Sequence, residues 1–309
     1  MLNTKHIIGL LVIAPLAIEA HLYMAHPTSR QFWRTVAYQS TGPDTEYCPH
    51  CYNFRGVSAV QARGGGGPWP HLKLYEEGEL NKNGNYMETA ETSKRHTSPC
   101  GDPVQTASSD SVNTYGLVNS KYPVLTTYDE GSEIHLKIVV STYHGGHIEL
   151  NLCDASASED AEVTHECLSE YPLDRVPADS EPPIDPVHTG RYFLDPPCRA
   201  ADNETDQSFD TNGAQPGDIV TMTYKLPEGL ICDRCVIQMM YYVANACVHP
   251  GYADFEAGDW SSSSECAPTK DDWLSSGMPL CGTEGSNYVE EFASCSDISI
   301  VSSGAATAT

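Results

Sequence analysis

Three histidines stand where they could bind a metal ion. His21 follows an apolar N-terminal stretch, and His144 and His147 enclose two glycines in the segment YHGGH. If His21 begins the mature chain, its α-amine and ring Nδ1 can chelate a metal together. A second histidine then completes a set of three nitrogens, which suits Cu(II), the divalent ion at the top of the affinity order. The sequence therefore predicts a copper site in which either His144 or His147 is the second histidine.

The first twenty residues predict how His21 becomes a chain terminus. Lys5 and His6 form a short polar region, and residues 7–18 form an apolar stretch. Such a stretch fits the core of a secretory signal peptide and is too short to span a membrane. Ala20 supplies the small residue that signal peptidase prefers before the cleaved bond. We therefore expect a signal peptide over 1–20, a secreted extracellular protein, and no membrane attachment after cleavage.

The 12 cysteines all follow this segment. Secretion exposes them to an oxidising compartment, so up to six disulfides are expected. The pairs Cys48/Cys51 and Cys232/Cys235 together resemble a four-cysteine zinc site, or singly a redox pair. Both alternatives are disfavoured, because secreted thiols should be oxidised and nothing resembles a thioredoxin unit.

The net charge of −25 excludes a protein that binds nucleic acid by neutralising phosphates. The charge is uneven: residues 21–153 carry a net −3, whereas residues 154–218 carry −13. The latter segment is rich in proline and contains a glycosylation sequon at Asn203. We expect it to be a long acidic loop excursion and not a second domain.

Alternating apolar residues predict strands over 134–140, 148–152 and 220–226. The continuous run VIQMMYYV over 236–243 predicts a strand buried on both faces. Long amphipathic helices are absent from the sequence pattern; 76–80 and 271–274 fit single turns. The predicted fold is all-β: a disulfide-rich, immunoglobulin/fibronectin-like antiparallel β-sandwich with long loops. We expect one domain over 21–300, followed by a Ser/Thr/Ala-rich tail over 301–309.

Five segments, in order along the chain, resemble those of lytic polysaccharide monooxygenases. They are HLYMAHPTSR (21–30), CGDP (100–103), HGGHIELNLC (144–153), CVIQMMYYVANAC (235–247) and EEFASCSDISI (290–300). The cysteine framework and the HLYM start look most like the pectin-active branch found in oomycetes. The chain departs from the family pattern at Met239, where a tryptophan is usual, and at Ala293, where a tyrosine is usual.

The resemblance assigns roles to individual residues. It implies that His21 and His144 hold one copper ion, because the family's second histidine stands nine residues before a cysteine, here Cys153. His147 is the fallback ligand. The resemblance also implies that Phe292 lies axial to the metal, where a phenyl ring offers no ligand atom.

Two further residues are candidates for orienting bound oxygen. Gln238 alternates with apolar neighbours on its predicted strand, and Glu290, or its neighbour Glu291, precedes the axial aromatic. A positioned amide or carboxylate can hold or move a proton at such a site.

The resemblance implies an oxidative enzyme that takes electrons from an external donor and uses O2 or H2O2 as co-substrate. Its partner is a plant cell-wall polysaccharide, pectin (homogalacturonan) by resemblance, and we expect a monomer. Chitin or cellulose is the alternative substrate. A non-catalytic secreted protein that binds copper or carbohydrate is a rival interpretation, and a hydrolase is a weaker one.

Charge bears on the choice of substrate, since an acidic protein repels anionic pectin. Five basic residues near the predicted site could form a local patch that offsets this repulsion: Arg30, Arg34, Lys73, Lys94 and Arg95. Chitin or cellulose would instead favour flat exposed aromatic residues, for which Trp33 and Trp69 are candidates.

Overall fold

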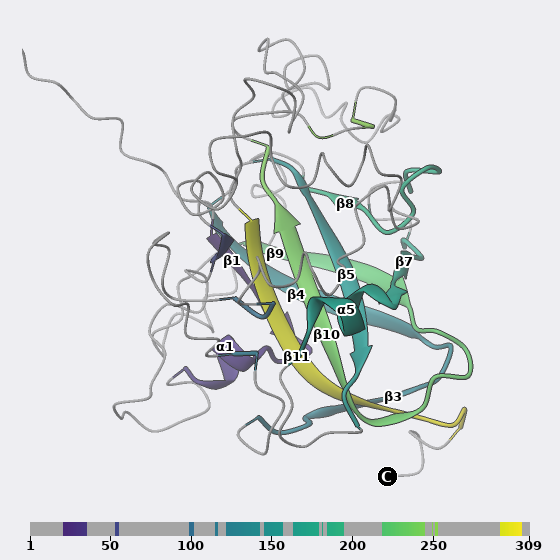
Figure 1. Cartoon of the computed structure of the whole chain (residues 1–309). Helices are drawn as coiled ribbons and strands as arrows, with labels where there is room; N and C mark the ends of the chain where they lie inside the picture. The colour runs from purple at the N-terminus through teal and green to yellow at the C-terminus, as the bar shows by residue number, and fades with distance from the viewer. Residues whose placement is uncertain are drawn as a thin grey trace, which may run out of the picture.

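A computed structural model of the chain describes thirteen segments of it. They are residues 21–35, 53–55, 99–101, 115–116, 122–142, 145–156, 163–178, 181, 184–194, 218–244, 249, 251–252 and 291–304. Their strands form two sheets that pack face to face (Figure 1), which confirms the predicted β-sandwich.

Sheet A contains four strands in the order β1-β4-β9-β7. Their bounds are β1 His21–His26, β4 Glu133–Thr142, β9 Asp218–Lys225 and β7 Asp174–Arg175. All of its pairings are antiparallel.

Sheet B contains seven strands. Five lie side by side in the order β2-β11-β10-β5-β6; in addition, β3 pairs with β11 and β8 pairs with β5. The bounds are β2 Asn53–Arg55, β3 Thr126–Asp129, β5 His147–Asp154, β6 Tyr171–Pro172, β8 Tyr192–Phe193, β10 Cys232–Tyr242 and β11 Glu291–Val301. One pairing departs from the expected antiparallel pattern, because β3 runs parallel to β11.

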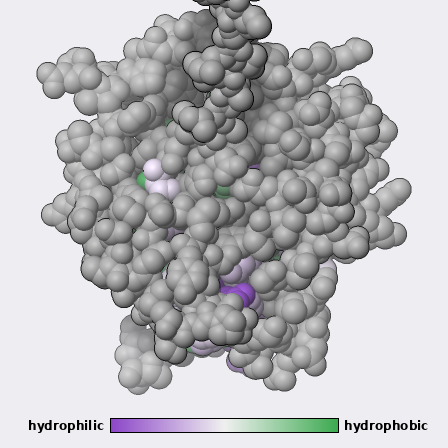
Figure 2. Space-filling view, turned by 90° about the vertical axis from the view of Figure 1, so that its left-hand side faces the viewer, coloured by the Kyte–Doolittle hydropathy of each residue, from purple (hydrophilic) through white to green (hydrophobic). Residues whose placement is uncertain are grey.

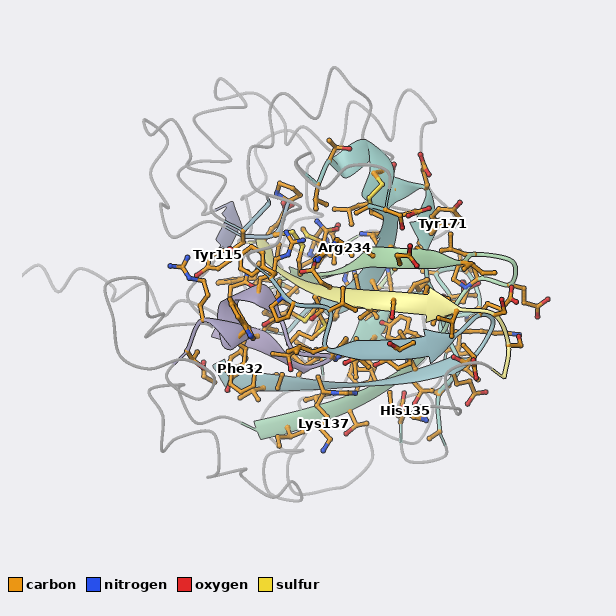
Figure 3. The ribbon with its side chains drawn as sticks, turned by 90° about the horizontal axis from the view of Figure 1, so that it is seen from below. Phe32, Tyr115, His135, Lys137, Tyr171 and Arg234 are labelled. Atoms are coloured by element: carbon orange, nitrogen blue, oxygen red, sulfur yellow. A yellow bond between two sulfur atoms is a disulfide. The ribbon has the colours of Figure 1, made fainter. Side chains whose placement is uncertain are left out.

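Period-two alternation explains the core between the sheets. In β4, Ile134, Leu136 and Ile138 point inward and are fully buried, whereas His135 and Lys137 are exposed. Seen from below, the latter two lie on the side of sheet A away from β11 (Figure 3). Apolar residues of β4 and β9 pair in register, so each buried side chain has a buried neighbour on the next strand.

The β10 strand is buried on both faces, as its apolar run predicts. Met239 and Tyr241 belong to the central core, whereas Val236 packs into a second cluster on the outer face of sheet B. The disulfides Cys100–Cys295 and Cys153–Cys167 staple this outer cluster, and a third disulfide joins Cys232 to Cys235. The Cys100–Cys295 bond spans 195 residues, a separation at which closing the loop stabilises the fold by roughly 5 kcal/mol in the chain-entropy model.

The described parts of the acidic excursion are attached to the sandwich. They contain the short helix α5 (His165–Ser169), and β6, β7 and β8 add to the edges of the two sheets. Figure 2 shows the side of the molecule that lies on the left in Figure 1, and the described residues reach this surface only as small patches. Within the described part of the chain, no helix has the length and hydropathy of a membrane span.

A buried ion pair ties the start of the domain to its last strand. Arg30 opens the helix α1 (Arg30–Trp33), and its guanidinium donates to both carboxylate oxygens of Asp297 in β11, at 2.6 and 2.9 Å. Both side chains are 1% exposed. Arg234 donates to the same carboxylate at 2.7 Å from a partly exposed position.

Two expectations about the surface are therefore wrong. Arg30 cannot join a basic patch, because its charge is buried against Asp297. Trp33 is not a flat exposed platform, since it is partly buried and its ring packs edge-on against Tyr122 at 6.0 Å. Arg34 is partly buried, and its guanidinium carbon lies 5.6 Å from the centre of the Tyr115 ring. The other patch candidates Lys73, Lys94 and Arg95, and the aromatic Trp69, lie outside the described residues.

A second polar cluster lies buried on the outer face of sheet B, where β5 begins and β10 ends. Its members are His147, Glu149, Arg191, His249 and Tyr252. His147 Nδ1 lies 2.5 Å from the Tyr252 hydroxyl, and Arg191 Nε donates to Glu149 at 3.2 Å. His249 Nε2 donates to a backbone carbonyl at 2.8 Å. Burial lowers the pKa of both imidazoles well below the usual value, and the Arg191 charge lowers it further, so both are neutral in the folded protein.

Asp297→Asn should lower the free energy of unfolding by about 3–5 kcal/mol, because it leaves buried arginine charge without its carboxylate. Glu228→Gln is the matched control, since it removes the acid of the exposed Lys225–Glu228 pair and should cost less than about 1 kcal/mol. Denaturant unfolding at pH 7 under non-reducing conditions measures both. Equal losses in the two variants would contradict the importance of the buried pair.

The neutral histidines predict destabilisation by acid. The unfolded chain binds a proton at His249 below pH about 6.5, whereas the folded protein resists it, so stability falls as pH drops through that value. In metal-free protein, His249→Gln should flatten the fall between pH 6.5 and 5 by up to about 1.4 kcal/mol per pH unit. A wild-type slope retained by His249→Gln would contradict the neutral assignment.

Candidate functional site

The ends of β1 and β4 meet at one edge of sheet A. In the backbone register, His21 lies opposite Thr142, and His144 follows Thr142 by two residues. The pairing therefore brings the backbone of His21 to the start of residues 143–146, the connection between β4 and β5 (hereafter the turn), which contains His144 in sequence. The side chain of His21, and His144 itself, lie outside what the structure describes.

Two glycines shape the end of this turn. Gly145 and Gly146 have φ values of +64° and +93°, a region that favours glycine. A Cβ on Gly146 would lie 2.0 Å from the carbonyl oxygen of Tyr242, so no larger residue fits there without displacing β10. The Gly146 carbonyl accepts a hydrogen bond from the amide of Leu194 at 3.0 Å. The chain that follows His144 is thus fixed against β10 and the segment after β8.

Phe292 lies at the same end of the sandwich. It is the second residue of β11, is 1% exposed, and shares the central core with Leu22 of β1. Its backbone pairs with that of Tyr241, and the two rings lie 5.9 Å apart. The fold therefore gathers the start of β1, the glycine turn and Phe292 at one edge.

The fold does not bring Gln238 to this group. Gln238 alternates onto the outer face of sheet B, three residues along β10 from Tyr241, which is roughly 10 Å at the rise of a strand. Its amide nitrogen donates to the carbonyl of Pro99 at 2.6 Å, and its amide oxygen accepts from Asn151 at 3.0 Å. Glu290 lies outside the described residues, and its neighbour Glu291 is buried in β11 opposite Tyr242.

His147, the fallback ligand, opens β5 and belongs to the buried polar cluster on the outer face. Its ring stacks on Tyr242 at 5.0 Å, and Nδ1 is engaged with the Tyr252 hydroxyl. Nε2 lies 3.2 Å from a Glu149 oxygen without hydrogen-bond geometry. Because the imidazole is neutral, this contact is not an ion pair between two charged groups.

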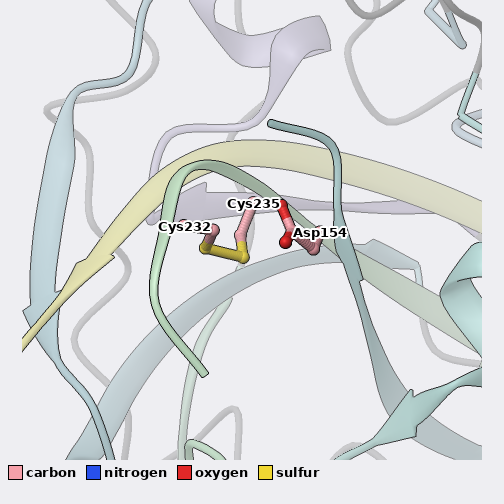
Figure 4. Close-up of side chains that lie close together, drawn as sticks. All are labelled: Asp154, Cys232 and Cys235. Atoms are coloured by element: carbon pink, nitrogen blue, oxygen red, sulfur yellow. A yellow bond between two sulfur atoms is a disulfide. The ribbon is translucent and has the colours of Figure 1, made fainter. Parts of the chain in front are cut away.

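Within the described residues, one group of metal-ligating side chains lies close together: Asp154, Cys232 and Cys235 (Figure 4). The two cysteines form a disulfide, so neither offers the thiolate that a zinc site requires. The four-cysteine zinc alternative is therefore wrong for this pair, while Cys48 and Cys51 lie outside the described residues.

Sequence reasoning missed two features of this end of the molecule. One is the Arg30–Asp297 pair, although both residues stand in the segments that carry the family resemblance. A signal was present in the sequence: Arg30 is the single arginine or lysine of segment 21–30, and Asp297 is the single charged residue of the run 292–300. The other is Tyr241, whose hydroxyl donates to the carbonyl of Gly145 at 2.8 Å; an aromatic residue in an apolar run gave no sign of it.

Among solved structures, the chain is similar to the lytic polysaccharide monooxygenase AA15 from Thermobia domestica in the Cu(I) state. The two share 16% identity over 91% of this chain and 98% of that one, with a TM-score of 0.47. It is also similar to an AA10 lytic polysaccharide monooxygenase from Streptomyces lividans, with 13% identity over 90% and 99% of the two chains and a TM-score of 0.37.

A chitin binding domain from Burkholderia pseudomallei shares 8% identity over 92% and 100% of the two chains, with a TM-score of 0.40. A search of curated proteins returned no match.

The family assignment rests on a different comparison. Residues 21–298 match the family described as lytic polysaccharide mono-oxygenase, cellulose-degrading. The match begins at His21 and runs through all five segments that carry the resemblance, ending within the last of them. With nearly the whole of the chain beyond residue 20 matched, this protein belongs to the lytic polysaccharide mono-oxygenase family.

Proposed function

We propose that the chain is a secreted, monomeric, copper-dependent polysaccharide monooxygenase whose signal peptide is removed after Ala20. One observation carries the proposal: His21 is the first residue of the family match and pairs in register with Thr142, beside the turn that holds His144. Cleavage of the Ala20–His21 bond would free the α-amine of His21 at the start of β1, close to where the second histidine is expected.

The donor set fits one copper ion. His21 would bind through its α-amine and ring Nδ1, and His144 through its imidazole, giving three nitrogens of the kind that Cu(II) prefers. Phe292 at the same edge would present a phenyl ring, which offers the metal no ligand atom. The described residues offer no competing thiolate cluster, since Cys232 and Cys235 are bonded to each other.

We place His144 ahead of His147 as the second ligand. The Nδ1 of His147 is occupied by Tyr252, and its ring is buried on the face of sheet B opposite to Phe292. Using His147 would require the outer polar cluster to open, whereas His144 lies on the turn that the pairing of β1 and β4 approaches.

Bound copper, reduced by an external donor, would supply the chemistry that lets O2 or H2O2 hydroxylate a C–H bond beside a glycosidic bond. The protein's part is to hold the ligands at the edge of a rigid sandwich and to keep one coordination position open. The side chain of Gln238 is bonded to Pro99 and Asn151 on the outer face, so it can contribute to the copper site only by holding the backbone in place. We keep Glu290 as a candidate for orienting the oxidant.

We propose pectin as the substrate, from the HLYM start and the cysteine framework. Cellulose and chitin are the competing substrates, and the description of the matched family names cellulose. Burial of Arg30 removes one of the five basic residues on which attraction to an anionic polymer was expected to depend. The substrate test must therefore compare the three polymers directly.

Protein processed to begin at His21, loaded with copper and given ascorbate, should release oxidised oligosaccharides from pectin, detected by mass spectrometry. The same protein with residues preceding His21 retained should release none, because its α-amine has become an amide. Product from cellulose or chitin alone would overturn the pectin proposal. Reductant-independent product, or none from any polymer, would overturn the monooxygenase proposal in favour of a hydrolase or a binding protein.

His144→Ala should weaken Cu(II) binding to the processed protein by more than the roughly 10–100-fold that loss of an outer-shell partner costs, because a direct ligand is removed. His26→Ala is the control, since His26 is an exposed histidine of β1 and should keep wild-type affinity. Isothermal titration calorimetry measures both variants. Wild-type affinity in His144→Ala would transfer the assignment to His147.

A further inference from the structure

We infer that Tyr241 is a positioning residue, which fixes the turn after His144 relative to Phe292. This inference rests on the proposed copper site and extends it to a residue outside the ligand set. Tyr241 touches both parts: its hydroxyl donates to the Gly145 carbonyl at 2.8 Å, and its ring lies 5.9 Å from that of Phe292.

Packing alone does not explain the hydroxyl group of Tyr241 in the apolar core. On its face of β10, Tyr241 follows Ile237 and Met239, and Val243 comes just after the strand; all three belong to the apolar core. Tyr241 itself is fully buried, and burying a phenol is unfavourable unless its hydroxyl is hydrogen-bonded. A phenylalanine would fill the same space, so the polar atom is explained by the carbonyl that it reaches.

The bond completes a set of restraints on the turn. Gly146 packs against the carbonyl of Tyr242 and is held from the other side by the amide of Leu194. Gly145, the residue directly after His144, is held by the Tyr241 hydroxyl. A metal ligand must be held within about 0.5 Å of its working position, and the Tyr241 bond acts on the Gly145–Gly146 peptide, which begins one residue after that ligand.

The test compares Tyr241→Phe with Tyr224→Phe. Tyr224 is also fully buried in the central core, and its hydroxyl donates to another glycine carbonyl, that of Gly190, at 3.0 Å, with a longer contact of 3.5 Å to the carbonyl of Ile148 in β5. Each variant therefore loses one buried hydroxyl-to-glycine bond, and each melting temperature should fall by roughly 2–4 °C. Only Tyr241→Phe removes a bond to the turn.

Two measurements separate positioning from general stability. In metal-free protein, amide hydrogen exchange over 143–147 should quicken in Tyr241→Phe and stay at the wild-type rate in Tyr224→Phe. In copper-loaded protein, Tyr241→Phe should lower Cu(II) affinity roughly 10-fold and shift the EPR spectrum, as loss of an outer-shell partner does. Tyr224→Phe should keep the wild-type affinity and spectrum. Tyr241→4-aminophenylalanine, which keeps a donor, should restore both properties.

The inference is overturned if Tyr241→Phe matches wild type in exchange and in EPR, or if the two tyrosine variants change both properties alike. Failure of the proposed function looks different: wild-type processed protein would then bind no copper through three nitrogens. In that case the metal-free exchange comparison still decides whether Tyr241 holds the turn.

Discussion

The buried contact between the Arg30 guanidinium and the Asp297 carboxylate joins the two ends of the domain. Arg30 stands nine residues after His21, and Asp297 five residues after Phe292. A charge with 1% exposure requires a partner, so moving α1 away from β11 would leave the Asp297 carboxylate with the Arg234 contact alone. The Cys100–Cys295 disulfide fastens the same strand two residues away. The register of β1 against β4, which brings His21 to the turn, therefore stands on a covalently and electrostatically fixed base.

Sheet B has a different environment on each face at the end where β10 finishes and β5 and β11 begin. Its inner face presents Tyr241 and Phe292 to the core, while its outer face buries neutral His147 and His249 beside the Glu149–Arg191 pair. Because neighbouring residues of a strand point to opposite faces, one residue decides which environment a side chain enters. His147 points to the outer face, where its imidazole is buried and bonded to Tyr252. The proposed metal ligand is therefore His144, in the turn that precedes β5.

Sequence patterns predicted the strands well and their partners poorly. The alternation in β4, β5 and β9 and the continuous run in β10 are local, so they could be read directly. Arg30 looked like a surface charge, because nothing local shows that Asp297 lies 267 residues away in sequence and 2.6 Å away in space. Trp33 and Tyr241 were misjudged or passed over for the same reason, since their contacts lie across the sandwich. The proposed ligands came from the processing site and from resemblance, not from periodicity.

The same long-range pairing changes the electrostatic case for a substrate. Arg30, Arg175 and Arg191 are all buried against carboxylates, so three of the chain's 17 basic residues cannot meet a polymer. Each internal pair is close to neutral, and the net charge of −25 is left to the remaining residues. Repulsion of an anionic polysaccharide is therefore as strong as the net charge of −25 indicates, although salt limits it to about 8–10 Å. Pectin can bind only where groups at the His21 edge act at contact range, whereas cellulose or chitin meets no such barrier. The choice between these polymers is thus decided within one Debye length of the site, and the charge of the chain as a whole does not settle it.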